Sequence, residues 1–115
     1  MSLTVTEKQA GSGVYILEIK GFIDTSTSSG LEEAIKKAHA ENRTKIVLDL
    51  SGSEFISSAG WGAMVAYLKK MRTAGGDLKL AAMAEKVDKV FKLMEFDSLI
   101  DAFSTVEEAV KSFKA

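Results

Sequence analysis

Residues 45–62 read KIVLDLSGSEFISSAGWG and contain the clearest strand-to-helix transition of the chain. The uninterrupted apolar run of residues 46–48 is typical of a strand buried on both faces of a sheet. A polar turn follows, and then Ser57 and Ser58 stand before a pattern with helical spacing over residues 58–73. Three interpretations of the two hydroxyls compete: an enzymatic nucleophile, a phosphate site and a plain helix cap.

Strand and helix patterns alternate on both sides of this stretch. Strands are predicted at residues 3–9, 14–20, 45–50 and 78–82, with a short strand or turn around Leu99 and Ile100. Helices are predicted from a capping box at Ser29–Glu32 to about Ala40, over residues 58–73 and 85–94, and after a second capping box that begins at Thr105. The order β-β-α-β-α-β-α-β-α predicts an α/β fold, with a mixed sheet of about four to five strands covered by about four helices. We expect residues 1–115 to form one domain.

Composition narrows the classes of function. Lysine and arginine number 15 and aspartate and glutamate 16, for a net charge of -1, so no basic excess favours nucleic-acid binding. The chain has no cysteine, which excludes disulfides and zinc sites built from cysteine. No basic start followed by an apolar core marks a signal peptide, and no apolar run approaches the roughly 20 residues that span a bilayer. We therefore expect a cytoplasmic protein without membrane insertion, and the motifs predict no cofactor or metal.

The enzymatic interpretation of the serines is weak. A nucleophile elbow needs a glycine two residues before the serine, and Ile56 takes that place before Ser58. The single histidine, His39, ends the first predicted helix and precedes the serine, whereas the hydrolase order places the histidine last. His39 is more simply a solvent-facing residue near a helix C-terminus, where positive charge suits the helix dipole. The sequence also has no G-x-x-x-x-G-K-[ST] phosphate loop, and Gly60 and Gly62 lack the third glycine of a dinucleotide motif.

The residues alone favour a structural interpretation of the turn. Ser57 or Ser58 would cap the helix, because a serine oxygen accepts from free N–H groups in the first turn. Ala59 and Gly60 would let that turn approach the sheet, and Trp61 would fill space.

Three segments together resemble a known family. GFID at residues 21–24, KIVLDLSG at 45–52 and EFISSAGWGAMV at 54–65 occur in order, within a chain whose β-α order also matches. They resemble the STAS domain of bacterial anti-sigma-factor antagonists. The resemblance implies a non-enzymatic regulator that binds an anti-sigma factor, which is often also a serine kinase. That kinase phosphorylates a serine in the turn and so ejects the antagonist, and a serine phosphatase reverses the modification.

Matching the turn by its glycine, Gly60, places the phosphoacceptor of the family on Ser58. Ser57 then stands where an acidic residue is frequent, and Ala59 stands where a second hydroxyl is frequent. These two departures leave a second hypothesis open: a STAS subunit of another signalling or transport complex that is not phosphorylated.

Two further residues have alternative interpretations. Asp24 matches an aspartate that neighbours this turn in the family, and equally suits a helix N-terminus as an acid beside the dipole. Trp61 is either an exposed interface anchor or a core residue, and we expect partial burial. With the phosphoacceptor Ser58, the resemblance implies a switch surface formed by Asp24, Ser57, Ala59, Gly60 and Trp61.

Overall fold

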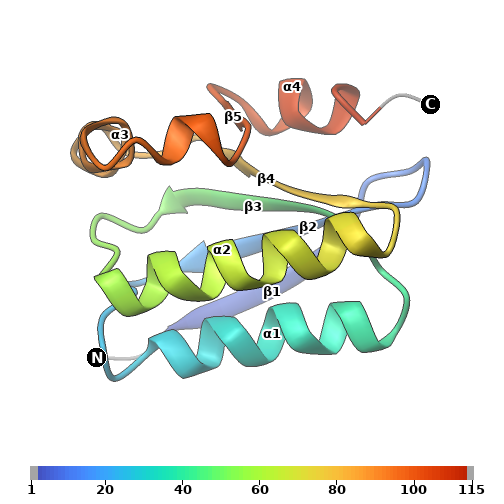
Figure 1. The fold of residues 1–115 in the computed structure, drawn as a ribbon, viewed down its shortest axis with the longest axis horizontal. Coiled ribbons are helices and arrows are strands. Elements are labelled where there is room, and N and C mark those ends of the chain that lie inside the picture. Colours follow the sequence, from blue (N-terminus) through green and yellow to red (C-terminus); the bar gives the residue numbers. More distant parts are fainter. Residues whose placement is uncertain (1–2, 114–115) are drawn as a thin grey trace.

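The computed structural model describes residues 3–113, which form a five-stranded sheet. The strands lie side by side in the order of the chain (Figure 1), and β1 and β2 are antiparallel while every other neighbouring pair is parallel. Their bounds are Thr4–Gln9 for β1, Val14–Lys20 for β2, Lys45–Gly52 for β3, Asp77–Ala81 for β4 and Ala102–Phe103 for β5. The predicted α/β class and mixed sheet are confirmed.

Helices cover both faces of the sheet. Helices α1 and α2 run side by side along one face, and α4 lies on the opposite face (Figure 1). Helix α3 contributes buried side chains to the same core as α1 and α2. The helices are α1 (Ser28–Ala40), α2 (Ser58–Thr73), α3 (Glu85–Leu93) and α4 (Val106–Lys111), with a 3-10 turn, η1, at Phe96–Ser98. Within residues 3–113, no helix combines the length and the apolar character that a membrane span needs.

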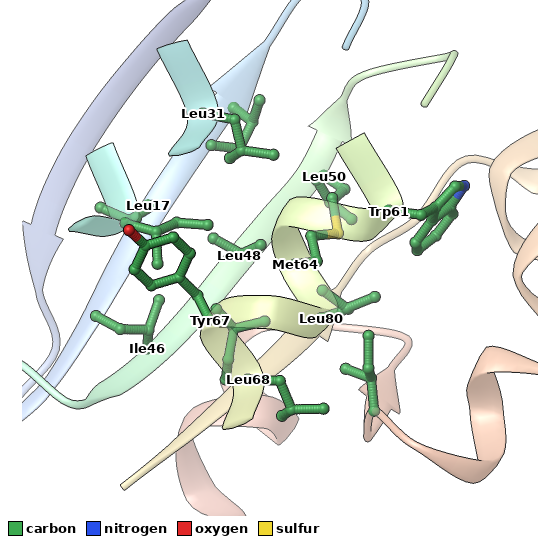
Figure 2. Packing of buried hydrophobic residues seen from close by; sticks show 14 of the residues in the cluster. Leu17, Leu31, Ile46, Leu48, Leu50, Trp61, Met64, Tyr67, Leu68 and Leu80 are labelled. Atoms are coloured by element: carbon green, nitrogen blue, oxygen red, sulfur yellow. The ribbon is translucent and has the colours of Figure 1, made fainter. Parts of the chain in front are cut away.

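The main core lies between the sheet and α1 and α2. Figure 2 shows leucine and isoleucine side chains of β2, β3 and β4 meeting Leu31 of α1 and Met64 and Leu68 of α2. A smaller cluster on the other face joins Val47 of β3 to Ala109 of α4. Strand β3 is therefore buried on both sides, as the sequence predicted, because its successive side chains enter different cores.

Helix α2 has the bounds that the sequence predicted. It ends at Thr73, and Gly75 then adopts a φ of 89°, a left-handed conformation that glycine reaches without the steric cost of a Cβ atom. The chain reverses there and enters β4, where the Asp77 N–H donates to the Thr44 carbonyl at 2.9 Å. The position of α2 fixes the place of Ser57 and Ser58 at the carboxyl edge of β3.

The prediction for the start of the first helix was wrong. Helix α1 begins at Ser28 after the N-cap residue Thr27, one residue before the predicted box, and no side chain caps it. The hydroxyl of Thr27 instead donates to the Phe22 carbonyl at 2.6 Å, so the preceding loop determines the start of the helix.

The short strand or turn expected around Leu99 and Ile100 is a turn. The strand follows at Ala102–Phe103, because Ile100 is buried in the main core and the chain pairs with β4 only beyond it.

Candidate functional site

Two loops meet at the carboxyl edge of the sheet. The N–H of Ile23 donates to the Phe55 carbonyl at 2.8 Å, and the N–H of Ser57 donates to the Ile23 carbonyl at 2.7 Å. These bonds make a short parallel bridge between Ile23 and Ile56. The loop that carries Asp24 is thereby fixed beside residues 57–60, which we call the serine turn.

The structure separates the roles of the two serines. Ser57 is the N-cap of α2, and its Oγ accepts a hydrogen bond from the Gly60 N–H at 3.2 Å. Ser58 is the first helical residue, and it is exposed. The first turn of α2, which is described in full, carries no acidic side chain, so the partial positive charge of the helix N-terminus is not offset there. An exposed hydroxyl therefore stands in a position that favours an added negative charge.

Asp24 organises the loop that precedes α1. Its Oδ1 accepts from the Ser26 hydroxyl at 2.7 Å, the Ser26 N–H at 2.9 Å and the Thr27 N–H at 3.1 Å. The Ser26 hydroxyl bond is the main reason that the pKa of Asp24 lies below its ordinary value, because these bonds favour the charged carboxylate. The backbone bonds of the neighbouring Ile23 therefore place Asp24 beside the serine turn. The Asp24 carboxylate makes hydrogen bonds within the loop before α1.

Gly60 is buried, and it allows the first turn of α2 to pack closely against Ile23 and Ile56. A Cβ atom on it would lie 2.6 Å from Ile23 Cγ2 and 3.0 Å from Ile56 Cγ2. Only a glycine lets the first turn of α2 approach the Ile23–Ile56 bridge this closely without displacing it. Ala59, by contrast, is exposed and lines a shallow groove of about 270 Å³ between α1 and α2.

Trp61 is a core residue, so the expectation of partial burial was wrong. Its side chain is 3% exposed, and its ring stacks on Phe96 at a centroid distance of 5.1 Å and lies 5.8 Å from Phe91. These two phenylalanines come from α3 and η1, far from Trp61 in the sequence, and they cover the indole. The buried Nε1 donor has no hydrogen-bond partner within residues 3–113.

An apolar pocket of about 460 Å³ adjoins the serine turn, and sequence reasoning missed it. Phe22 and Phe55, which follow β2 and β3, contact each other with ring centroids 6.3 Å apart. The apolar walls of the pocket are formed by Phe22, Phe55, Ile56, Trp61, Val87 and Val90. The charged residues Glu54 and Lys86 also border the pocket. Bulky apolar residues directly beyond two parallel strands were a signal for this pocket, since such ends meet at one edge of a sheet.

The serine turn lacks the partners of a nucleophile. His39 lies in the last turn of α1, and that end of the helix is at the opposite edge of the sheet from the start of α2 (Figure 1). Among the described residues, no group of three or more histidine, aspartate and glutamate side chains is placed to hold a metal ion. The single histidine of the chain is therefore not placed to act as a general base for Ser57 or Ser58.

Comparisons with known proteins agree with this geometry. A family model described as "STAS domain" matches residues 6–109. The anti-sigma-F factor antagonist RsfB of Mycobacterium tuberculosis is 36% identical over 111 residues, which cover 95% of this chain and 88% of RsfB. The crystal structure of an anti-sigma factor antagonist from Mycobacterium paratuberculosis superposes with a TM-score of 0.88 at 25% identity, over 98% of this chain and 95% of that one.

A more distant comparison shows the fold alone. The phosphorylated form of SpoIIAA, a Bacillus cell fate determinant, has a TM-score of 0.72 at 17% identity, over 96% of this chain and all of SpoIIAA. With the family model matched over nearly the whole chain, the protein belongs to the STAS domain family, and its relatives in that family include anti-sigma-factor antagonists.

Proposed function

We propose that this protein is an anti-sigma-factor antagonist of the cytoplasm. It binds an anti-sigma factor that is also a serine kinase, through the surface around the serine turn. Phosphorylation of Ser58 by that kinase ends the complex, and a serine phosphatase restores the binding form. The protein itself performs no catalysis in this scheme.

The proposal rests mainly on the different structural roles of Ser57 and Ser58. The Ser57 hydroxyl already accepts a bond from Gly60 within the helix cap, whereas the Ser58 side chain is exposed at the first position of α2. A kinase therefore meets Ser58 as the accessible hydroxyl of the turn. RsfB, the relative from M. tuberculosis, is an anti-sigma-F factor antagonist by name, and SpoIIAA, which shares the fold, is known in a phosphorylated form; both fit an antagonist that is controlled by phosphorylation.

Electrostatics explains how one phosphate would switch binding. The modification adds about -1.5 to -2 charges at pH 7. The N-terminus of α2 tolerates that charge because the first N–H groups of a helix have no intrahelical carbonyl partner. The fold of the antagonist then stays the same. A partner surface packed on the turn meets a desolvated charge and repulsion from any acidic group, which costs several kcal/mol.

The first experiment locates the phosphate. The purified protein is incubated with ATP and each serine-kinase anti-sigma factor encoded in the same genome, and the modified residue is identified by mass spectrometry. We expect one phosphate on Ser58, none in Ser58→Ala, and retained modification in Ser57→Ala. Phosphate on Ser57, or on a residue outside the serine turn, would contradict the assignment.

The second experiment tests the switch. Ser58→Asp should weaken binding to the anti-sigma factor by about tenfold or more, since a buried like charge at an interface is costly. Ser104→Asp is the matched control, because Ser104 is also an exposed serine near the start of a helix and lies two residues before α4. Equal binding by both variants would count against the switch.

A second candidate function follows from Ser57. Antagonists of this family frequently carry an acidic residue at that position, and here a serine serves as the cap. In this alternative the same surface binds a partner in another signalling or transport complex without phosphorylation. Binding of a partner that is unaffected by ATP, together with an unmodified Ser58, would favour it.

A further inference from the structure

The apolar pocket and the serine turn belong to one continuous segment. Phe55 and Ile56 form part of the wall of the pocket, and Ser57 and Ser58 follow them directly. The Ile23–Ile56 bridge fixes both loops in place, so the pocket is a rigid neighbour of the turn. Anything that covers the turn closely also reaches the pocket.

Apolar side chains near the pocket stay exposed to an unusual extent. Phe22, Phe55 and Val90 are 40%, 47% and 43% exposed. At the end of α3, Leu93 and the C-cap residue Met94 lie three and four residues after Val90 and are 80% and 57% exposed, which extends the apolar surface beyond the pocket. Exposed apolar clusters of this kind mark interaction surfaces, because leaving them in water gives up the free energy of burial.

Trp61 joins the pocket to the main core. It lines the pocket, its side chain is 97% buried, and its ring packs against Phe91 and Phe96. The indole nitrogen lies at the outer end of the ring, away from Met64 and Leu68 (Figure 2). A side chain that entered the pocket would therefore pack beside the indole and change the surroundings of its N–H group.

We infer that this pocket is the anchor site for a large apolar side chain of the partner protein. This inference rests on the proposed function, and it names what the partner must supply: a leucine-like or phenylalanine-like side chain on a segment that lies across α3. Cavities of about this size hold drug-sized ligands, so a side chain and the adjoining backbone have room.

A protein segment fits these observations better than a small molecule does. The apolar surface continues past the pocket to Leu93 and Met94, which a ligand confined to the pocket would leave in water. Protein interfaces concentrate their binding energy in such pockets, surrounded by weaker contacts. The pocket would supply affinity, while Ser58 beside it would supply control by charge.

The test combines substitutions in the pocket with a matched control. Val90→Asp and Phe55→Ser change exposed wall residues, and either variant should weaken binding to the anti-sigma factor by about 30-fold. Leu99→Asp is the control, because Leu99 is an equally exposed apolar residue that lies outside the pocket. The Leu99 carbonyl accepts a hydrogen bond from Arg72, near the end of α2. We expect Leu99→Asp to bind within about threefold of the wild type. Titration calorimetry with the purified anti-sigma factor measures all four proteins.

A spectroscopic readout reports whether the pocket is filled. Trp61 is the one tryptophan of the chain, so ¹⁵N-labelled protein gives a single indole Nε1–H signal. In the free Val90→Asp and Phe55→Ser variants, this signal at its usual position shows that the core around Trp61 is intact. On binding of the anti-sigma factor to the wild type, the signal should shift, because an inserted side chain changes the surroundings of the indole.

The results of these binding and NMR experiments distinguish failure of the anchor site from failure of the proposed function. If the wild type binds none of the anti-sigma factors of its genome, the proposed function and this inference both fail. If the wild type binds but the pocket variants bind equally well, or the indole signal stays in place, only the anchor site fails. If Val90→Asp instead dissociates a homodimer in sedimentation experiments, or native mass spectrometry finds a small molecule lost from the pocket variants, a different occupant holds the pocket and the inference is overturned.

Discussion

The N–H of Ser57 donates a 2.7 Å hydrogen bond to the carbonyl of Ile23, and this bond fastens the start of α2 to the loop after β2. The two residues are distant in sequence, yet each continues a strand of the parallel sheet. The bond brings Asp24, the serine turn and the apolar pocket to one edge of the domain.

Gly60→Ala should destabilise the protein by about 1–3 kcal/mol, because the new methyl group would overlap the buried Ile23 and Ile56 side chains. Gly62→Ala is the control in the same helix. A Cβ atom at Gly62 meets nothing within 4 Å, so alanine should stabilise α2 by up to about 1 kcal/mol. Urea unfolding of both variants measures the free energy. Equal effects of the two substitutions would contradict the close approach at Gly60.

Ser57→Ala and Ser58→Ala should differ in stability. Loss of the cap at Ser57 should cost about 1 kcal/mol, whereas Ser58→Ala should change the free energy of unfolding by less than about 0.5 kcal/mol. Thr105→Ala measures the stability lost on removing another N-cap of this protein, with which the effect of Ser57→Ala can be compared. The Thr105 hydroxyl accepts from the Glu108 N–H at 3.1 Å in the cap of α4. A larger loss for Ser58→Ala than for Ser57→Ala would reverse the assignment of the cap.

Asp24 should contribute stability that depends on pH. Its folded-state pKa lies below the ordinary value of 3.8, mainly through the Ser26 hydroxyl bond. The contribution is therefore present above the unfolded pKa and is lost as the pH falls through the lower folded value. Asp24→Asn should lower the melting temperature at neutral pH and make it less sensitive to acid. A carboxyl carbon titration by NMR that gives Asp24 a pKa of 3.8 or higher would contradict this.

Lys79 should hold α4 on the sheet. It is 7% exposed, and its Nζ donates to the Ser112 hydroxyl at 2.7 Å and to the Ser112 carbonyl at 3.2 Å, beyond the last turn of α4. The ammonium also lies 4.3 Å from the ring centroid of Phe113. Lys79→Ala should cost about 2–3 kcal/mol, since it removes a charged hydrogen bond and buried stem contacts.

Lys79→Met separates these two contributions, because methionine keeps an apolar stem but donates no hydrogen bond. It should be less destabilising than Lys79→Ala, and both should speed amide hydrogen exchange in α4 more than in α1. Unchanged exchange in α4 would show that the helix is held by its apolar contacts alone.

Elements whose signals are local could be predicted from the amino-acid sequence. The bounds of α2, the burial of β3 on both faces and the cap at Thr105 all follow from periodicity and capping within a few residues. The resemblance in three segments also identified the family. These features can be predicted because helix caps and side-chain alternation depend on residues that are close together in the sequence.

Other features depend on contacts between distant parts of the chain. Trp61 is buried because Phe91 and Phe96 come from distant segments to cover it, and β5 lies at Ala102–Phe103 because β4 supplies its partner. The choice between Ser57 and Ser58 as the cap, and the pocket beside them, depended on how two loops meet at one edge of the sheet. Contacts between residues distant in the chain have no local pattern, since packing of the whole domain sets their geometry.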